Sequence, residues 1–578
     1  MGFMGGFGFS RSQAEQDAWE VKAYQDTLAA RVADHHNAMG DENFEVGEEK
    51  NAGGYKQNYR AFVLAFAAYM GIILFGYDTG LGGGVIAQPA FIRDMGITAT
   101  GKPLADIKGN IVSILQGGSF FGALGAAPLS NAIGRKRSLM IGCAIFAVGG
   151  FLQTFGRSLN FQYAGRFLAG FGVGIESSVC PTYVAELAPA AIRGNITGLF
   201  QVCVVTGVAL SYWINYACSF LGPNDSNAWR IPVAMQLVFV GIMSIIIPFI
   251  KESPRWLASK GRNSEACKNL AWVRLRPEDD YRVQAELAEI IAAVEADKEA
   301  MAGVSWTKEI TAKGKPKRFF IAIMMFVCQQ WSGQNSINYY APEIFESIGI
   351  KGTKASLLAS GVYGLVKIVA TALFMAFGVE RAGRKKYFVF GALGMGTFLM
   401  MIGAVFNTHP PDRNAESPSG ASIGMAVLIY LFVIPYCFSW GGLVWVYISE
   451  LFDTRSRAYG IAFANASQWL NNFAITKTTP LLVIAFNKGG IFFFFGALNF
   501  CNLIFSLWIP ETIKLSLEQV DIVFGSVSKE DRMRAVTERF NAGAAGMAYN
   551  EKNKSVDDDE KYTTDIVHDE DASRSHPR

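Results

Sequence analysis

Residues 329–340 read QQWSGQNSINYY and follow directly on the apolar run 319–328. Amide side chains are unfavourable in contact with lipid, because a polar group without a hydrogen-bond partner costs several kcal/mol there. Gly333, in the middle, allows a helix to bend or open. On a continuous helix the polar side chains form two neighbouring faces: Gln329, Ser332 and Ser336 on one, and Gln330, Gln334 and Asn338 on the other. Such faces suit a ligand rich in hydroxyl groups or a hydrogen-bonded seam between helices, and the density of amides favours the ligand.

The composition of the chain indicates an all-α protein with many membrane spans. Of its 578 residues, 51% are hydrophobic and only 17% are charged, and the mean hydropathy is +0.22. A soluble chain of this length normally carries more charge. The apolar residues fall in blocks of about 20, long enough to cross about 30 Å of hydrocarbon. The net charge of +3 and the lack of a basic patch with interleaved aromatics predict no nucleic-acid partner.

The cysteines and histidines predict neither a metal site nor a disulfide framework. The eight Cys lie mostly inside the apolar blocks and form no CxxC pair, which is typical of packing residues. The five His all fall outside the apolar blocks, so a proton that crosses the membrane must be bound by a carboxylate. We find no nucleophile–base set and no nucleotide-binding loop, and therefore expect neither an enzyme nor a cofactor.

Twelve predicted spans divide the chain into two sets of six. The spans lie at 60–85, 109–130, 138–156, 160–185, 193–218, 229–250, 319–345, 356–380, 387–407, 422–449, 458–486 and 489–509. The predicted domains are a cytoplasmic tail at 1–58, a six-helix bundle at 59–250, a cytoplasmic linker with helices at 251–318, a second bundle at 319–512 and a cytoplasmic tail at 513–578. In the linker, Leu287, Ile290, Ile291 and Val294 predict one amphipathic helix. Lys and Arg are concentrated on the side of both termini, which places the termini in the cytoplasm.

The two sets of spans repeat each other. The sequence GRKR at 134–137 recurs as GRKK at 383–386. The spacing of Glu186 and Arg193 recurs in Glu450 and Arg457, and ESPR at 252–255 is echoed by PET at 510–512. Offsets of about 250–265 residues at three markers indicate a duplicated six-helix unit.

Over nearly all of residues 60–525 the chain resembles the sugar porter family of the major facilitator superfamily. The resemblance is carried by the repeated markers above together with FGYD at 75–78, GR at 165–166, YVAELAP at 183–189, ESPRWL at 252–257, ERAGR at 380–384 and the amide stretch. Fungal members in the branch of quinate permeases and galacturonate transporters are the most similar. The resemblance implies two pseudo-symmetric six-helix bundles, transport by alternating access, and a plasma-membrane protein, which we expect to be monomeric.

Asp78 in the first span and Arg166 in the fourth match the proton-coupling pair of proton-coupled relatives. Both lie in the outer half of their spans and can pair, and an ionisable residue inside the membrane is by default functional. Protonation of Asp78 would release Arg166 and let the helices rearrange. The alternative is a permanent salt bridge in a facilitator that carries no proton.

The family's substrate positions fall on six residues of this chain: Gln201, Gln329, Gln330, Asn335, Trp445 and Asn472. Amides donate to and accept from vicinal hydroxyls, and a tryptophan covers the apolar face of a ring. Core packing is a plausible alternative for Trp445 alone. The family usually has Gly-Pro before that tryptophan, whereas this chain has Gly441-Gly442, so we expect the tenth span to hinge differently.

Charged residues at the cytoplasmic ends can latch the two bundles together in the outward-open state. The residues are Arg135, Arg137, Glu186, Arg193, Glu252, Arg384, Glu450, Arg457 and Glu511. Setting the topology is a second role that the same charges can serve.

Lys367 stands in the middle of the eighth span, where the family usually has Asn. Its ammonium cannot easily reach either membrane surface, so it must face the cavity and meet an anion. That anion is either Glu176 in the fourth span or a carboxylate of the substrate, and Lys477 in the eleventh span adds weakly to the second possibility.

These observations predict a proton-coupled importer of a small polyhydroxylated substrate, with a sugar acid of the galacturonate or quinate type preferred. A neutral hexose or pentose carrier is the alternative within the same class. A non-transporting sugar sensor on the same fold is the alternative from another class. Fungal sensors that resemble this family carry long signalling tails, so the tail of roughly 65 residues after Pro510 argues mildly against this alternative.

Overall fold

The computed structural model describes residues 58–301, 310–312, 314–378, 383–411, 417–452, 454–486, 489–513 and short pieces of 515–537. Residues 48–513 form one compact unit, and residues 514–578 belong, with 1–47, to a second unit. In the second unit the structure describes one short helix, α22 (Leu517–Val523). The predicted domain boundaries stay predictions.

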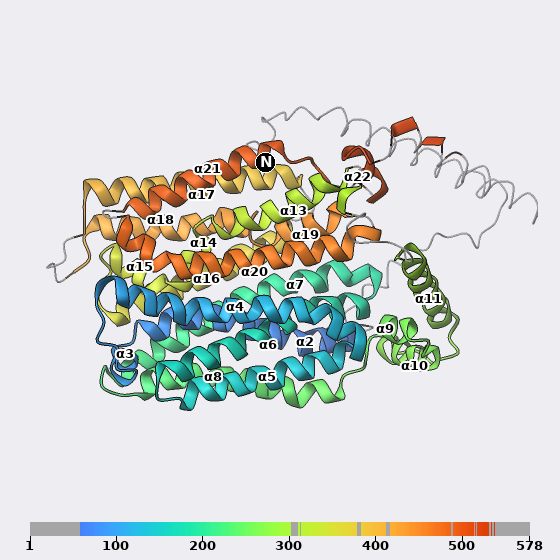
Figure 1. Cartoon of the computed structure of the whole chain (residues 1–578), viewed down its shortest axis with the longest axis horizontal. Helices are drawn as coiled ribbons and strands as arrows, with labels where there is room; N and C mark the ends of the chain where they lie inside the picture. The colour runs from blue at the N-terminus through green and yellow to red at the C-terminus, as the bar shows by residue number, and fades with distance from the viewer. Residues whose placement is uncertain are drawn as a thin grey trace, which may run out of the picture. The chain divides into compact units, whose positions relative to one another are not determined.

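The first half of the chain supplies six long helices. They are α2 (Tyr59–Ile86), α4 (Gly101–Ile133), α5 (Arg135–Phe155), α6 (Leu159–Leu187), α7 (Ala190–Cys218) and α8 (Asn227–Ile246). A short helix, α3 (Pro89–Asp94), follows α2, and 3-10 turns at Ser219–Leu221 and Ile247–Phe249 follow α7 and α8. These helices run side by side and form the lower part of the bundle in Figure 1.

The second half repeats the arrangement with two interrupted helices. Its elements are α13 (Lys315–Gln330), α14 (Gln334–Tyr339), α15 (Ala341–Ser347), α16 (Thr353–Phe377), α17 (Arg384–Thr408), α18 (Gly420–Cys437), α19 (Leu443–Leu451), α20 (Thr454–Ala485) and α21 (Gly490–Trp508). The two halves meet along α4 and α20 and along α7 and α16. In Figure 1 the second half, in yellow to red, lies above the first half.

Nine helices of the described residues are long and apolar enough to span a membrane by themselves. The predicted spans not among these nine are α6, α20 and the interrupted segment α13–α15. Together they make the twelve spans of the major facilitator fold, and the described residues contain no β-strand.

The seventh span is broken inside the amide stretch, which corrects the two continuous polar faces expected there. The segment α13 ends at Gln330, and Gly333 has φ +87°, a left-handed conformation that glycine adopts without a steric penalty. The tenth span is also broken, over residues 438–442 between α18 and α19, but without a left-handed glycine: Gly442 has φ −105°. Side chains on either side of each break therefore point in directions that a single helix would not give them.

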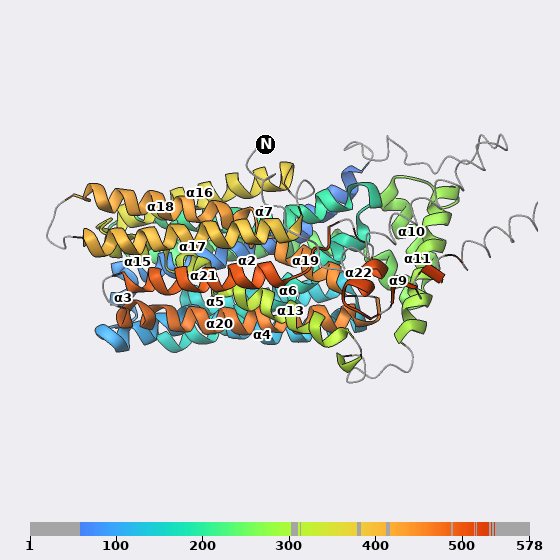
Figure 2. The same cartoon turned by 90° about the horizontal axis from the view of Figure 1, so that it is seen from above.

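Three helices follow the sixth span and lie at one end of the bundle in both views (Figures 1 and 2). They are α9 (Pro254–Ser259), α10 (Asn263–Arg274) and α11 (Tyr281–Met301). Leu287, on α11, packs into a small core with Trp256 and Leu257, as the amphipathic pattern predicts. We call the opposite end, where α3 and α15 lie, the distal end; with both termini in the cytoplasm it would be extracellular.

Candidate substrate and proton site

Asp78 on α2 and Arg166 on α6 form a buried ion pair. Arg166 Nη1 donates to Asp78 Oδ1 at 2.9 Å, and the residues are 1% and 3% exposed. Asp78 Oδ2 and Arg166 Nε have no hydrogen-bond partner. Removing one charge of such a pair is costly because the other stays buried and unpaired. The pair can therefore act as a switch that a proton on Asp78 would open.

The broken seventh span reaches this ion pair through Tyr339 on α14. The Tyr339 hydroxyl accepts from Asn472 Nδ2 at 3.2 Å and lies near Thr79 and the Asp78–Arg166 pair. Asn472 Oδ1 is buried and has no partner. The backbone of Tyr339 also lies so close to Gly83 that any side chain there would collide with its carbonyl. A movement of α14 is thus coupled by contact to the charged pair.

The amides of the stretch use much of their bonding capacity to hold the two broken spans. Gln329 Nε2 donates to Trp440 O at 2.6 Å and to Gly441 O at 3.1 Å, which joins the seventh span to the break in the tenth. Across the break of the seventh span, Asn335 Nδ2 donates to Gln330 Oε1. A ligand that binds these amides would therefore also act on the two hinges.

Trp445 and Gln201 lie beside the break in the tenth span. The Trp445 ring makes edge contacts with Phe200 on α7 and Phe326 on α13, at centroid distances of 6.3 and 4.8 Å. A side chain added at Gly442 would meet the Gln201 side chain at an ordinary contact distance of 3.5 Å. Residues from both halves thus gather around α19.

Lys367 lies in the middle of α16 and is 4% exposed. Its Nζ donates to Asn338 Oδ1 at 3.1 Å and lies 5.9 Å from the centre of the Tyr436 ring. Among the described residues no carboxylate forms an ion pair with it. Glu176 lies elsewhere, in the interior of the first half, and neither of its oxygens accepts a hydrogen bond of ordinary geometry from the described residues. The structure therefore excludes Glu176 as the partner of Lys367 in this conformation.

Lys477 has a different environment and lends no support to a substrate carboxylate. Its Nζ donates to Asn110 Oδ1 at 2.6 Å and lies 3.4 Å from Asp106 Oδ1, both on α4. Nearby, Lys108 Nζ pairs with Glu343 Oε1 at 2.6 Å. These contacts join the two halves at the distal end, so this conformation is closed there.

The charge clusters at the end where α9–α11 lie bond within each half. Arg135 pairs with Glu186 at 2.9 Å, and Arg384 pairs with Glu450 at 2.9 Å. Two carboxylates cap the helices that begin at Arg135 and Arg384: Glu252 accepts from the backbone N–H of Arg135 and Lys136, and Glu511 accepts from those of Arg384 and Lys385. Arg137 is exposed, and the side chains of Arg193 and Arg457 lie outside the described residues. Each of these contacts joins residues of one half, and a latch between the halves stays a prediction.

The comparison with known proteins identifies the family. The family "Sugar (and other) transporter" matches residues 64–524. The chain belongs to the sugar porters of the major facilitator superfamily. It is 36% identical over 479 residues to a probable quinate permease of Aspergillus fumigatus, covering 81% of this chain and 88% of that protein. It is 35% identical over 500 residues to a quinate permease of Neurospora africana, covering 84% and 92%.

Solved structures of the xylose transporter XylE from E. coli share the fold. A partially occluded inward-open form matches with a TM-score of 0.66 and 25% identity, covering 78% of this chain and 99% of that one. The proton:xylose symporter XylE bound to 6-bromo-6-deoxy-D-glucose matches with a TM-score of 0.66 and 26% identity, covering 81% and 100%. The predicted family, the twelve-helix fold and the prediction of a transporter and not an enzyme are confirmed. The chain is a multi-pass membrane protein.

Two glutamines of this sugar porter were missed among the candidate residues. Gln116 on α4 and Gln468 on α20 are buried, and each has at least one amide atom without a hydrogen-bond partner among the described residues. Each is an amide within a predicted apolar span, which is the signal that singled out residues 329–340. Gln334 on α14, which belongs to that stretch, donates to the Tyr363 hydroxyl at 2.5 Å, and its oxygen has no partner among the described residues.

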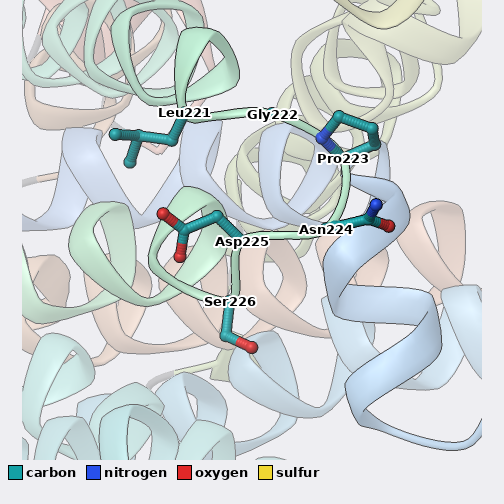
Figure 3. Close-up of a pocket in the computed structure, with 6 residues that line it drawn as sticks. All are labelled: Leu221, Gly222, Pro223, Asn224, Asp225 and Ser226. Atoms are coloured by element: carbon teal, nitrogen blue, oxygen red, sulfur yellow. The ribbon is translucent and has the colours of Figure 1, made fainter.

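A surface pocket at the distal end is unrelated to this site. It is lined by the loop Leu221–Ser226, none of which is a candidate residue (Figure 3). Next to it, burial acts to raise the pKa of Asp94, but hydrogen bonds from Ser226, Trp229 and Arg93 outweigh it and lower the pKa to about 2. Asp94 is therefore ionised at physiological pH and fastens α3 to α8, a structural role.

Proposed function

We propose that this sugar porter is a proton-coupled symporter that imports a small polyhydroxylated acid of the quinate or galacturonate type. It would work as a monomer in the plasma membrane, with both termini in the cytoplasm. Transport by the major facilitator fold is its family's activity; the substrate and the coupling ion are the proposal.

The observation that carries the substrate class is the buried ammonium of Lys367. It has a neutral amide, Asn338, as its hydrogen-bond partner and no anion among the described residues. A buried cation without an anion is costly, so a ligand that brings a carboxylate gains from binding here. Asn338 belongs to the amide stretch, which places the charge next to donors and acceptors suited to hydroxyl groups. The names of the quinate permease relatives agree with this substrate class.

The Asp78–Arg166 ion pair supports proton coupling. Both side chains are almost fully buried, and the pair lies next to Tyr339 on α14, the segment that follows the break in the seventh span. A proton on Asp78 would cancel the attraction and free Arg166, which changes the relative stability of two arrangements of the bundle. XylE, with the same fold, is a proton:xylose symporter.

Uptake in yeast cells lacking their own sugar transporters tests the substrate class. Labelled galacturonate and quinate are compared with glucose and xylose, in the wild type and in Lys367→Asn. A charge-assisted hydrogen bond is worth about 1.5–3 kcal/mol, so uptake of the acids should weaken about tenfold or more while neutral sugars are spared. Lys477→Asn is the matched control, because that lysine is paired with Asp106 and should not affect selectivity.

Three outcomes would decide against the proposal. A wild type that carries glucose or xylose and ignores both acids would make it a neutral monosaccharide carrier. Equal losses for all four substrates in Lys367→Asn would show that Lys367 is structural. A protein that reaches the cell surface and transports none of them would favour a sugar sensor.

A further inference from the structure

A second acid lies inside the first half, apart from the substrate residues. Glu176 on α6 is fully buried, and among the described residues neither carboxylate oxygen accepts a hydrogen bond of ordinary geometry. Glu176 lies where α2, α5, α6 and α8 meet. A Cβ added at Gly71 on α2 would lie 2.9 Å from Glu176 Oε2 and 3.0 Å from the terminal methyl of Met243 on α8. The Cys143 thiol on α5, a weak hydrogen-bond donor, lies beside the carboxylate.

Among the residues that the structure describes, the neighbours of Glu176 provide no positive charge. The titratable groups beside it are two thiols, of Cys143 on α5 and of Cys180 one turn further along α6. From α2 and α8 it meets Gly71 and Met243. Tyr69, two residues before Gly71, donates its hydroxyl to Ile196 O and so points towards α7. An ionised carboxylate in this setting would be very costly, so Glu176 carries its proton in this conformation.

The position of Glu176 relates it to the Asp78–Arg166 pair. Gly71 precedes Asp78 by seven residues, which is two turns on the same face of α2 and about 10 Å along its axis. Gln236 is two turns from Met243 on the inward face of α8, fully buried, and its Oε1 has no partner. Gln236 is therefore about level with Asp78, and Glu176 lies about two helical turns nearer the end where α9–α11 lie.

We propose that Glu176 is a second proton-binding site, which receives the proton that Asp78 gives up during transport. The inference rests on the proposed proton coupling. In this step the O–H bond of Asp78 breaks, its carboxylate pairs with Arg166, and an O–H bond forms on a carboxylate oxygen of Glu176. The described conformation would correspond to the state after the step: Asp78 is paired with Arg166, and Glu176 is buried with no cation beside it among the described residues, a setting that favours its neutral form. Release from Glu176 requires water from the side of α9–α11, because the ionised carboxylate has no cation beside it.

The experiment compares two kinds of transport in vesicles that contain the purified, full-length protein. Accumulation driven by a pH gradient requires the proton to move, whereas exchange of labelled for unlabelled substrate at equal pH does not. Glu176→Gln keeps the shape of the side chain and cannot release a proton. It should exchange substrate as the wild type does but accumulate none above equilibrium, and Glu176→Asp should restore part of the accumulation. Cys180→Ser, a buried change one turn away, is the matched control and should behave as the wild type in both measurements.

Accumulation by Glu176→Gln at the wild-type level would overturn the proposal, since a neutral amide would then serve as well. If that variant fails to fold, infrared difference spectra of the wild type and Glu176→Asp decide instead. A protonated-carboxyl band that shifts in Glu176→Asp and disappears between about pH 5 and about pH 9 supports the site, and a band that never titrates overturns it. A wild type that accumulates nothing under a pH gradient would refute the proton coupling itself, which is a separate result.

Discussion

Substituting Gly83 by alanine tests whether contact between α2 and α14 closes the distal end. A Cβ at Gly83 would lie closer than 3.0 Å to the carbonyl oxygen of Tyr339, a separation that real Cβ atoms essentially never show. Comfortable contact needs about 3.5 Å, so α14 must withdraw by at least about 0.5 Å. Overpacking of this kind costs about 1–3 kcal/mol, which moves the balance between closed and open forms by about 5- to 150-fold.

A reporter cysteine measures that balance. Ser113 is 1% exposed on the face of α4 that meets α20, between Gly109 and Gly117, which both contact α20. In Ser113→Cys cells, Gly83→Ala should speed labelling by a membrane-impermeant thiol reagent by about 5-fold or more and slow net uptake. Gly82→Ala is the matched control, because its Cβ would meet only ordinary contacts, at 3.4 Å from Val112 and 3.5 Å from Arg166.

Equal labelling rates in the Gly83 and Gly82 variants would refute the reasoning, since the close approach would then not determine closure. Faster labelling in both would show that any alanine in this part of α2 loosens the bundle. Surface expression, measured for each variant, separates these results from misfolding.

Three further predictions follow from the same contacts. Asp78→Asn should abolish accumulation under a pH gradient and leave exchange partly intact, because Arg166 loses its charged partner in every state; unchanged accumulation would end the coupling role of Asp78. Lys108→Glu or Glu343→Lys alone should speed labelling of the reporter cysteine, because each breaks the 2.6 Å ion pair between Lys108 and Glu343, and the double exchange should restore the pair and slow labelling again. Equal labelling rates in all three variants would show that this ion pair plays no part in closure. Gln330→Ala should raise the half-saturation concentration severalfold, since one buried hydrogen bond is worth about 0.5–1.5 kcal/mol, and unchanged uptake kinetics would show that the amide only stabilises the break.

Most of the fold could be predicted from hydropathy and repetition. Apolar blocks of membrane-spanning length located all twelve spans, and the paired GRKR and GRKK markers showed that the chain is duplicated. Hydropathy could not show that the seventh and tenth spans are each broken, because a break leaves the composition unchanged. Gly333 and the pair Gly441-Gly442 hinted at the breaks, and only the structure placed them, through the left-handed conformation of Gly333 and the end of α18 at Cys437.

The sequence predicted which residue types line the candidate site, but it did not predict which groups they contact. The sequence indicated that amides, a tryptophan and an ion pair serve the site, and their burial agrees with their being unusual in lipid. It did not indicate that Gln329 holds the backbone of the tenth span or that Asn338 accepts from Lys367. Those contacts join segments about 30 to 110 residues apart, which no local pattern encodes.

The sequence by itself determined the environment of this protein, the number of its spans and the residue types in its polar interior. These follow from the cost of placing each side chain in lipid, which is a property of the residue and its near neighbours. The partners of each buried charge were decided only by the tertiary structure. Lys367 had two possible anions in the sequence, and packing turned Glu176 into the interior of its own half, among Gly71, Cys143 and Met243. Which groups a buried charge meets depends on how helices distant in sequence pack, and that packing separates Lys367, the basis of the proposed substrate class, from Glu176, the proposed second proton site.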